Sequence, residues 1–79
     1  MNLEEAAEDT LEAVRGKLSA MRYEDGNSGA HACWMLEGIR DGYVQHEKGH
    51  RWLGYAQGLL VAFGELTLDE AKRINKRAS

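Results

Sequence analysis

Proline is absent from this 79-residue chain, and cysteine occurs only once, as Cys33. A single cysteine excludes a disulfide within one chain and is typical of a reducing compartment such as the cytoplasm. Cys33 stands among apolar residues in the segment AHACWML, which favours a buried, unreactive thiol over a nucleophile. The absence of proline also means that no proline ring interrupts a helix.

Long apolar runs are missing as well. The longest one extends from Leu59 to Phe63, whereas a helix that crosses a bilayer needs about 20 apolar residues. The first segment, MNLEEAAEDT, is acidic and lacks the apolar region of a signal peptide. These absences predict a cytoplasmic protein without a membrane contact.

Basic residues are fewer than acidic ones, and the formal net charge is -3 at pH 7. The surface as a whole therefore does not attract phosphate. Acidic residues crowd the beginning of the chain, and basic residues crowd its end at Lys72, Arg73, Lys76 and Arg77. We interpret both groups as solvated helix faces. The alternative is a small nucleic-acid-associated regulator that uses the basic C-terminal helix, with Arg73 and Arg77 as contacts.

Apolar residues recur with helical spacing through nearly the whole chain, and strand-like alternation is scarce. This pattern predicts a single all-α domain over residues 1–79, built as a small bundle of three to four helices. Asn2 can cap the first helix, and Thr67 with Glu70 forms a capping box for the last. The expected helices cover, in order, about 3–23, 29–41, 47–64 and 68–76.

The third of these helices, about 47–64, is the most apolar and is expected at the centre of the core. The members of its broad apolar face are Trp52, Leu53, Ala56, Leu59, Leu60 and Phe63. The second helix is expected to bury Ala32, Met35, Leu36 and Ile39, with Tyr43 as a candidate further member. The fourth offers a thin stripe of Leu68, Ala71 and Ile74.

Two features predict a homodimer. The first helix carries an apolar seam with spacings of four and three, which fits a partner helix in the same chain or in a second copy. Its members are Ala7, Leu11, Val14, Leu18 and Met21. Gly54 and Gly58 lie within the third helix, which indicates either a closely passing backbone or simple tolerance. Because small chains gain stability from oligomerisation, Leu11, Leu18, Gly54 and Gly58 are candidate contact residues.

One motif suggests a chemistry. Residues 46–50, His46-Glu47-Lys48-Gly49-His50, have the H-E-x-x-H pattern of zinc metalloproteases. That pattern binds zinc when both histidines project from one continuous helix, and the glutamate activates the bound water. Here Lys48 adds positive charge, Gly49 weakens the helix, and a turn at Asp41-Gly42 would leave His46 at a helix start. We therefore expect no catalysis, metal or cofactor, with a zinc hydrolase at His46 and His50 as the alternative.

Residues 31–76 resemble the small accessory proteins encoded by tailed bacteriophages and prophages. The similarity is carried by Trp34-Met35-Leu36-Glu37-Gly38, by Glu47-Lys48 with His50-Arg51-Trp52-Leu53-Gly54, by Gln57-Gly58 and by Thr67-Leu68-Asp69-Glu70. The resemblance includes no site motif, and it implies an accessory factor that binds a host or phage protein. We accordingly expect a non-enzymatic protein–protein interaction module that modulates or inhibits a host protein.

Overall fold

The computed structural model of the chain describes residues 1–15 and 29–79. These residues form four α-helices, and no strand occurs among them. The predicted all-α bundle is therefore confirmed. The helices are α1 (Leu3–Val14), α2 (Gly29–Arg40), α3 (His46–Ala62) and α4 (Leu68–Arg77).

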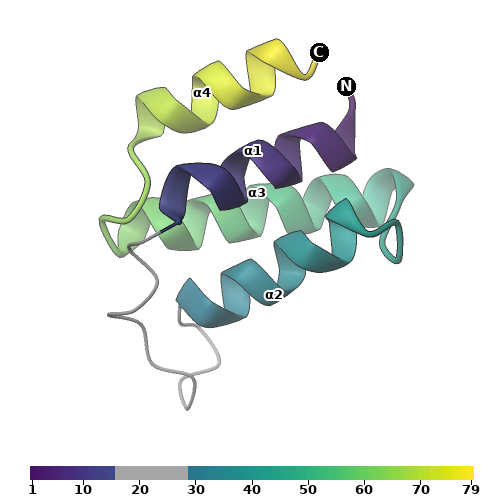
Figure 1. The fold of residues 1–79 in the computed structure, drawn as a ribbon, viewed down its shortest axis with the longest axis horizontal. Coiled ribbons are helices and arrows are strands. Elements are labelled where there is room, and N and C mark those ends of the chain that lie inside the picture. Colours follow the sequence, from purple (N-terminus) through teal and green to yellow (C-terminus); the bar gives the residue numbers. More distant parts are fainter. Residues whose placement is uncertain (16–28) are drawn as a thin grey trace.

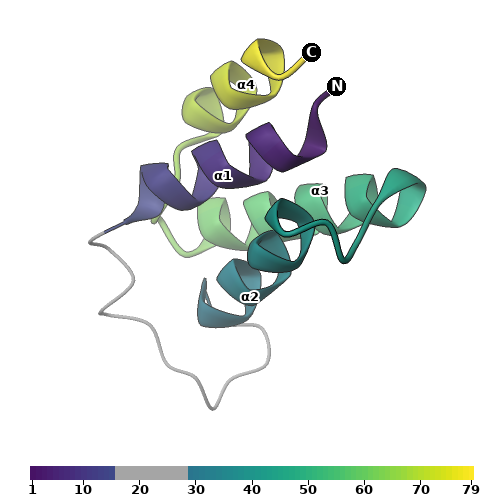
Figure 2. The same cartoon turned by 45° about the vertical axis from the view of Figure 1, so that its right-hand side comes forward.

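Helix α1 lies between α4 and the pair formed by α2 and α3 (Figures 1 and 2). It contacts all three other helices, while α2 and α3 also pack closely against each other. The two chain ends meet, because the backbone N–H of Asn2 donates to the carbonyl oxygen of Ala78 at 2.6 Å. The core is therefore organised around α1 as well as around α3.

The helix starts carry the caps that the sequence predicts. Asn2 accepts a hydrogen bond from the backbone N–H of Glu5 at 3.0 Å. At the start of α4, the Glu70 N–H donates to the Thr67 hydroxyl at 3.0 Å, and the Thr67 N–H donates to the Glu70 carboxylate at 2.8 Å. Both arrangements satisfy backbone donors that a helix leaves unpaired at its first turn.

Helix α1 ends at Val14, before the end expected for the first helix. Arg15 has a ψ of 135°, which takes the backbone out of the helical region directly after Val14. The prediction of one uninterrupted helix from Leu3 to about residue 23 is therefore wrong at Arg15, and the part of that prediction over residues 16–23 lies outside the described residues. Of the predicted seam, Ala7 and Val14 are fully buried, while Leu18 and Met21 lie outside the described residues.

The core-facing side of α3 also differs from the prediction. Leu53, Ala56 and Leu60 are buried as expected, but Trp52 and Leu59 are only partly buried and Phe63 is 50% exposed. The apolar face of this helix is wider than the surface that α1 and α2 cover, so its margins stay at the surface. Two further expected members of the core are exposed, namely Tyr43 in the loop after α2 and Leu68 at the start of α4.

Candidate functional site

Three rings form a continuous group across α2 and α3, namely His31, Trp34 and Trp52. Tyr43, in the loop after α2, lines the same hollow as the two tryptophans, and we call these four residues the aromatic surface. His31 and Trp34 stack with their ring centroids 5.6 Å apart and their planes 20° apart. Trp34 and Trp52 are also 5.6 Å apart, at 37°. Trp34 is 58% exposed and Tyr43 is 85% exposed. Large rings therefore remain in water although a buried core is present next to them.

The local sequence explains how the two tryptophans meet. On α2, Met35, Leu36 and Ile39 face the core, so Trp34 points to the opposite side of the helix. On α3, Trp52 stands at the margin of the core-facing side. Gly38 presents no side chain where the Trp52 ring approaches α2, since a Cβ placed there would lie 3.8 Å from its Cζ3 atom. A shallow hollow of about 410 Å³ opens beside the rings and is lined by Trp34, Glu37, Gly38, Asp41, Tyr43, Val44 and Trp52.

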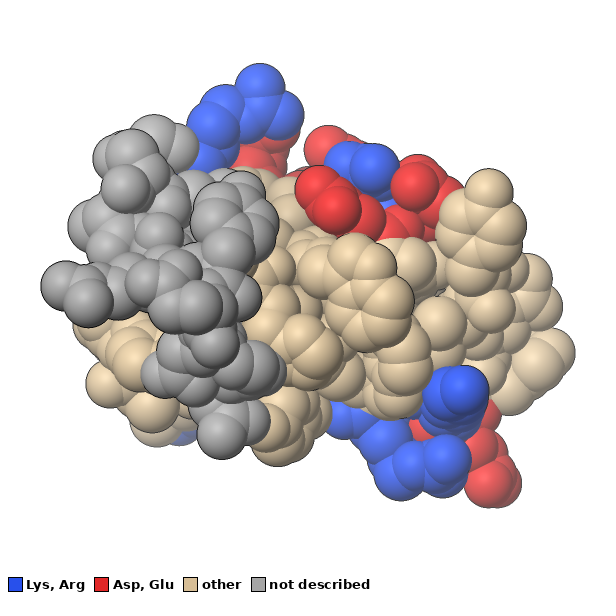
Figure 3. Space-filling view, turned by 90° about the horizontal axis from the view of Figure 1, so that it is seen from below, with Lys and Arg blue, Asp and Glu red and all other residues tan. Residues whose placement is uncertain are grey.

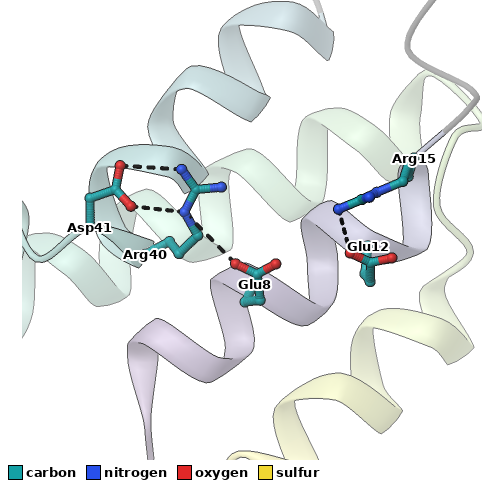
Figure 4. A network of polar contacts seen from close by, with 5 residues as sticks. All are labelled: Glu8, Glu12, Arg15, Arg40 and Asp41. Atoms are coloured by element: carbon teal, nitrogen blue, oxygen red, sulfur yellow. Dashed lines mark hydrogen bonds and ion pairs between the residues drawn. The ribbon is translucent and has the colours of Figure 1, made fainter.

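Acidic groups border the α2 side of the aromatic surface. Glu37 and Asp41 line the hollow. Glu8 of α1 is close to them, because it contacts Arg40, the neighbour of Asp41 in the chain. Arg40 donates to both carboxylate oxygens of Asp41, at 2.8 and 3.2 Å, and stands 3.7 Å from Glu8 (Figure 4). This hydrogen bond holds the pKa of Asp41 below its ordinary value, so the carboxylate is charged at neutral pH. One arginine is thus set among three carboxylates.

Basic groups border the opposite, α3 side. The Lys48 ammonium lies 5.3 Å from the centroid of the Trp52 ring, within the range of a cation–π contact. Arg51 precedes Trp52 and is exposed. Figure 3 shows a strip without charged side chains, with a mainly red group that includes a blue side chain above it and a mainly blue group with some red below it.

The histidines of the H-E-x-x-H segment take a different geometry from that of a zinc helix. His46 has a φ of 57°, in the left-handed region, so it does not continue the right-handed turn that carries His50. Both histidines are exposed beside a hollow of about 590 Å³ that Met1 and Glu4 also line. Within residues 1–15 and 29–79, no group of three or more His, Cys, Asp or Glu side chains could hold a metal ion.

The other predicted contact residues are scattered over the molecule. Leu11 is partly buried and packs on the core of its own chain, and Leu18 lies outside the described residues. Gly54 and Gly58 are exposed, and a Cβ on either would meet nothing within 4 Å. Arg73 and Arg77 lie on α4, where Arg77 approaches Asp9 at 3.7 Å. A hollow between α1 and α4 mixes these arginines with Asp9, Glu12 and Glu70, so the basic end of α4 faces acidic groups.

Sequence reasoning did not select Trp34 as a site residue. The signal was present, because Trp34 falls outside the stripe of Ala32, Met35, Leu36 and Ile39 that the periodicity assigned to the core. A large aromatic residue off the buried stripe of an amphipathic helix is a candidate for a contact surface. Its juxtaposition with Trp52 depends on how α2 and α3 pack, which the spacing along the chain does not specify.

No protein-family model, curated protein or solved structure matches the chain. Among the described helices, none has both the length and the apolar character that a membrane-spanning segment needs.

Proposed function

We propose that this chain is a non-enzymatic protein–protein interaction module and that the aromatic surface is its contact face. The observation that carries the proposal is the exposure of Trp34 next to Trp52 on two packed helices. Leaving such rings in water forgoes the free energy of burying them, and contiguous exposed apolar patches mark interaction sites. Tryptophan and tyrosine are also among the residues that contribute most to binding energy at protein interfaces.

The surface suits recognition because it is held by regular secondary structure. Trp34 and Trp52 project from helices, and a Cβ placed on Gly38 of α2 would be in van der Waals contact with the Trp52 ring, so this ring lies close against α2. A rigid platform loses little conformational entropy on binding. The resemblance to phage-encoded accessory proteins makes a host protein the candidate partner, and modulation or inhibition of that protein the candidate effect.

A capture experiment with matched variants tests the proposal. Tagged wild-type protein is incubated with lysate of a bacterial host, and retained proteins are quantified by mass spectrometry. The Trp34→Ala variant should lose the specific partner. Leu68→Ala is the matched control, because Leu68 is also 58% exposed but lies on α4, away from the aromatic surface. Circular dichroism of both variants should match that of the wild type, since neither side chain is buried.

Two results of the capture experiment would contradict the proposed contact face. A partner that Trp34→Ala retains as well as the wild type, and that Leu68→Ala loses, would place the contact face on the α4 side. Equal retention by all three proteins would remove the aromatic surface from the binding mechanism.

A further inference from the structure

The charges around the aromatic surface are arranged in a way that restricts its partner. The α2 margin carries Glu37 and Asp41, with Glu8 nearby and Arg40 paired to Asp41, so acidic groups outnumber the one cation. The α3 margin carries Lys48 and Arg51 next to the exposed Glu47, so basic groups are in excess there. The two tryptophan rings lie between these margins, since both line the hollow with Glu37 and Asp41 and Trp52 also lies beside Lys48. A strip without charged side chains separates the two groups in Figure 3. A partner of uniform charge would be attracted at one margin and repelled at the other.

We propose that the aromatic surface binds a second copy of this chain, in a dimer whose two-fold axis runs along the uncharged strip. This inference rests on the proposed function, since both use the same surface. Rotation about such an axis brings the acidic margin of one copy onto the basic margin of the other, and the reverse contact forms at the same time. The rings of the two copies then cover each other, and both margins face opposite charge.

The structure of the single chain supports this choice of face. Helix α1, with its buried Ala7 and Val14, packs on its own chain, so its apolar seam is already covered where it is described. The aromatic surface combines exposed apolar rings with charge that is complementary to itself. Small domains that bury a limited core commonly gain stability by association.

Charge-reversed variants give a direct test. Glu37→Arg places a cation on the acidic margin, and Arg51→Glu places an anion on the basic margin. Both positions are exposed and helical, and both new residues are good helix formers, so the fold should persist. In a two-fold dimer each change occurs twice and creates two like-charge contacts. Each variant alone should therefore show a dimer dissociation constant at least about tenfold higher than the wild type at low salt.

An equimolar mixture of the two variants should dimerise again. In the mixed dimer, arginine at position 37 of one copy faces glutamate at position 51 of the other, and the original Arg51 and Glu37 form the second contact. Sedimentation equilibrium of the wild type, each variant and the mixture measures this. Lys72→Glu on α4 is the control for a change in net charge, and it should leave the dissociation constant unchanged.

Fluorescence provides an independent readout, because Trp34 and Trp52 are the only two tryptophans of the chain. Their emission should shift to shorter wavelength as the wild type is concentrated through its dimerisation range. Neither variant alone should show the shift over that range, and the mixture should show it.

The possible results separate this inference from the proposed function. A wild type that stays monomeric up to millimolar concentration, or a mixture that stays monomeric while the wild type dimerises, would overturn the dimer. If a partner is still captured through Trp34 in that case, the proposed function stands with a different protein as the occupant. If Trp34→Ala changes neither association nor capture, both proposals are wrong.

Discussion

The side-chain amides of Gln57 and Asn75 hydrogen-bond each other in both directions, each at 3.0 Å, and so join α3 to α4. The Gln57 amide also donates to the Thr10 hydroxyl at 3.1 Å, and that hydroxyl donates to the carbonyl oxygen of Ala6 at 2.7 Å. Thr10 is fully buried and Gln57 is 6% exposed. A satisfied polar network of this kind specifies how α1, α3 and α4 align, because any shift would leave buried groups without partners.

The first prediction concerns this network. Gln57→Ala should lower the free energy of unfolding by about 1–3 kcal/mol, because Thr10 and Asn75 each lose a hydrogen-bond partner. Urea denaturation of Gln57→Ala, Asn75→Ala and the double variant measures the effect. The double variant should cost less than the sum of the single ones, since the two amides act on each other. Strict additivity would contradict the paired arrangement.

Leu60 and Phe63 are predicted to differ strongly in their contribution to stability. Leu60 is fully buried, so Leu60→Ala should cost about 2–5 kcal/mol through lost burial and the cavity left behind. Phe63 is 50% exposed, so Phe63→Ala should cost clearly less than the about 3–5 kcal/mol typical of a buried phenylalanine. Chemical denaturation of the two variants decides the order. A larger loss for Phe63→Ala would restore the sequence-based assignment of that ring to the core.

The glycines of α3 should respond to alanine in opposite ways. A Cβ at Gly54 or Gly58 meets nothing within 4 Å, so alanine there should stabilise the helix by about 0.5–1 kcal/mol. At Gly49 the same atom would lie 2.9 Å from Leu3 Cδ1 and 3.2 Å from the Val44 carbonyl oxygen. Gly49→Ala should therefore lower the melting temperature while Gly54→Ala raises it. Destabilisation by Gly54→Ala would indicate that another surface passes close to this glycine.

Cys33 should be unreactive in the folded protein. Burial, with a smaller contribution from the charge of Glu37, raises the pKa of its thiol to about 11. The thiolate that attacks a disulfide reagent is therefore rare at pH 8, and labelling should be slow until urea unfolds the chain. The fold holds this proton more tightly than the unfolded chain does. The protonated thiol therefore adds to the free energy of unfolding below pH 9, and this contribution is lost as the pH rises towards 11. The Cys33→Ser variant should lack this pH dependence.

The histidine pair should not retain zinc. Because His46 has a left-handed backbone, it and His50 do not present the paired ligands of a regular helix. Elemental analysis of protein purified without chelator should find well under one equivalent of zinc. One full equivalent that disappears in His50→Ala would contradict this and return the hydrolase to first place.

The sequence alone determined the helical class and several boundaries of this protein. Those signals are local: Asn2, Thr67 and Glu70 bond to backbone within their own first turn, and the loop after Arg40 contains Gly42 at a φ of 83°. The position of Cys33 among apolar neighbours likewise predicted its burial correctly. Such features need no knowledge of how the helices pack.

Tertiary structure decided which margins of the apolar faces are covered. Periodicity identifies a broad apolar side of α3, but only the placement of α1 and α2 leaves Trp52 and Phe63 at its edges and Leu60 inside. The meeting of Trp34 with Trp52, and of Gln57 with Asn75 and Thr10, joins residues far apart in the sequence. These contacts depend on how the helices pack and on the pairing of buried polar groups. The spacing of residues along a single helix predicts neither of them.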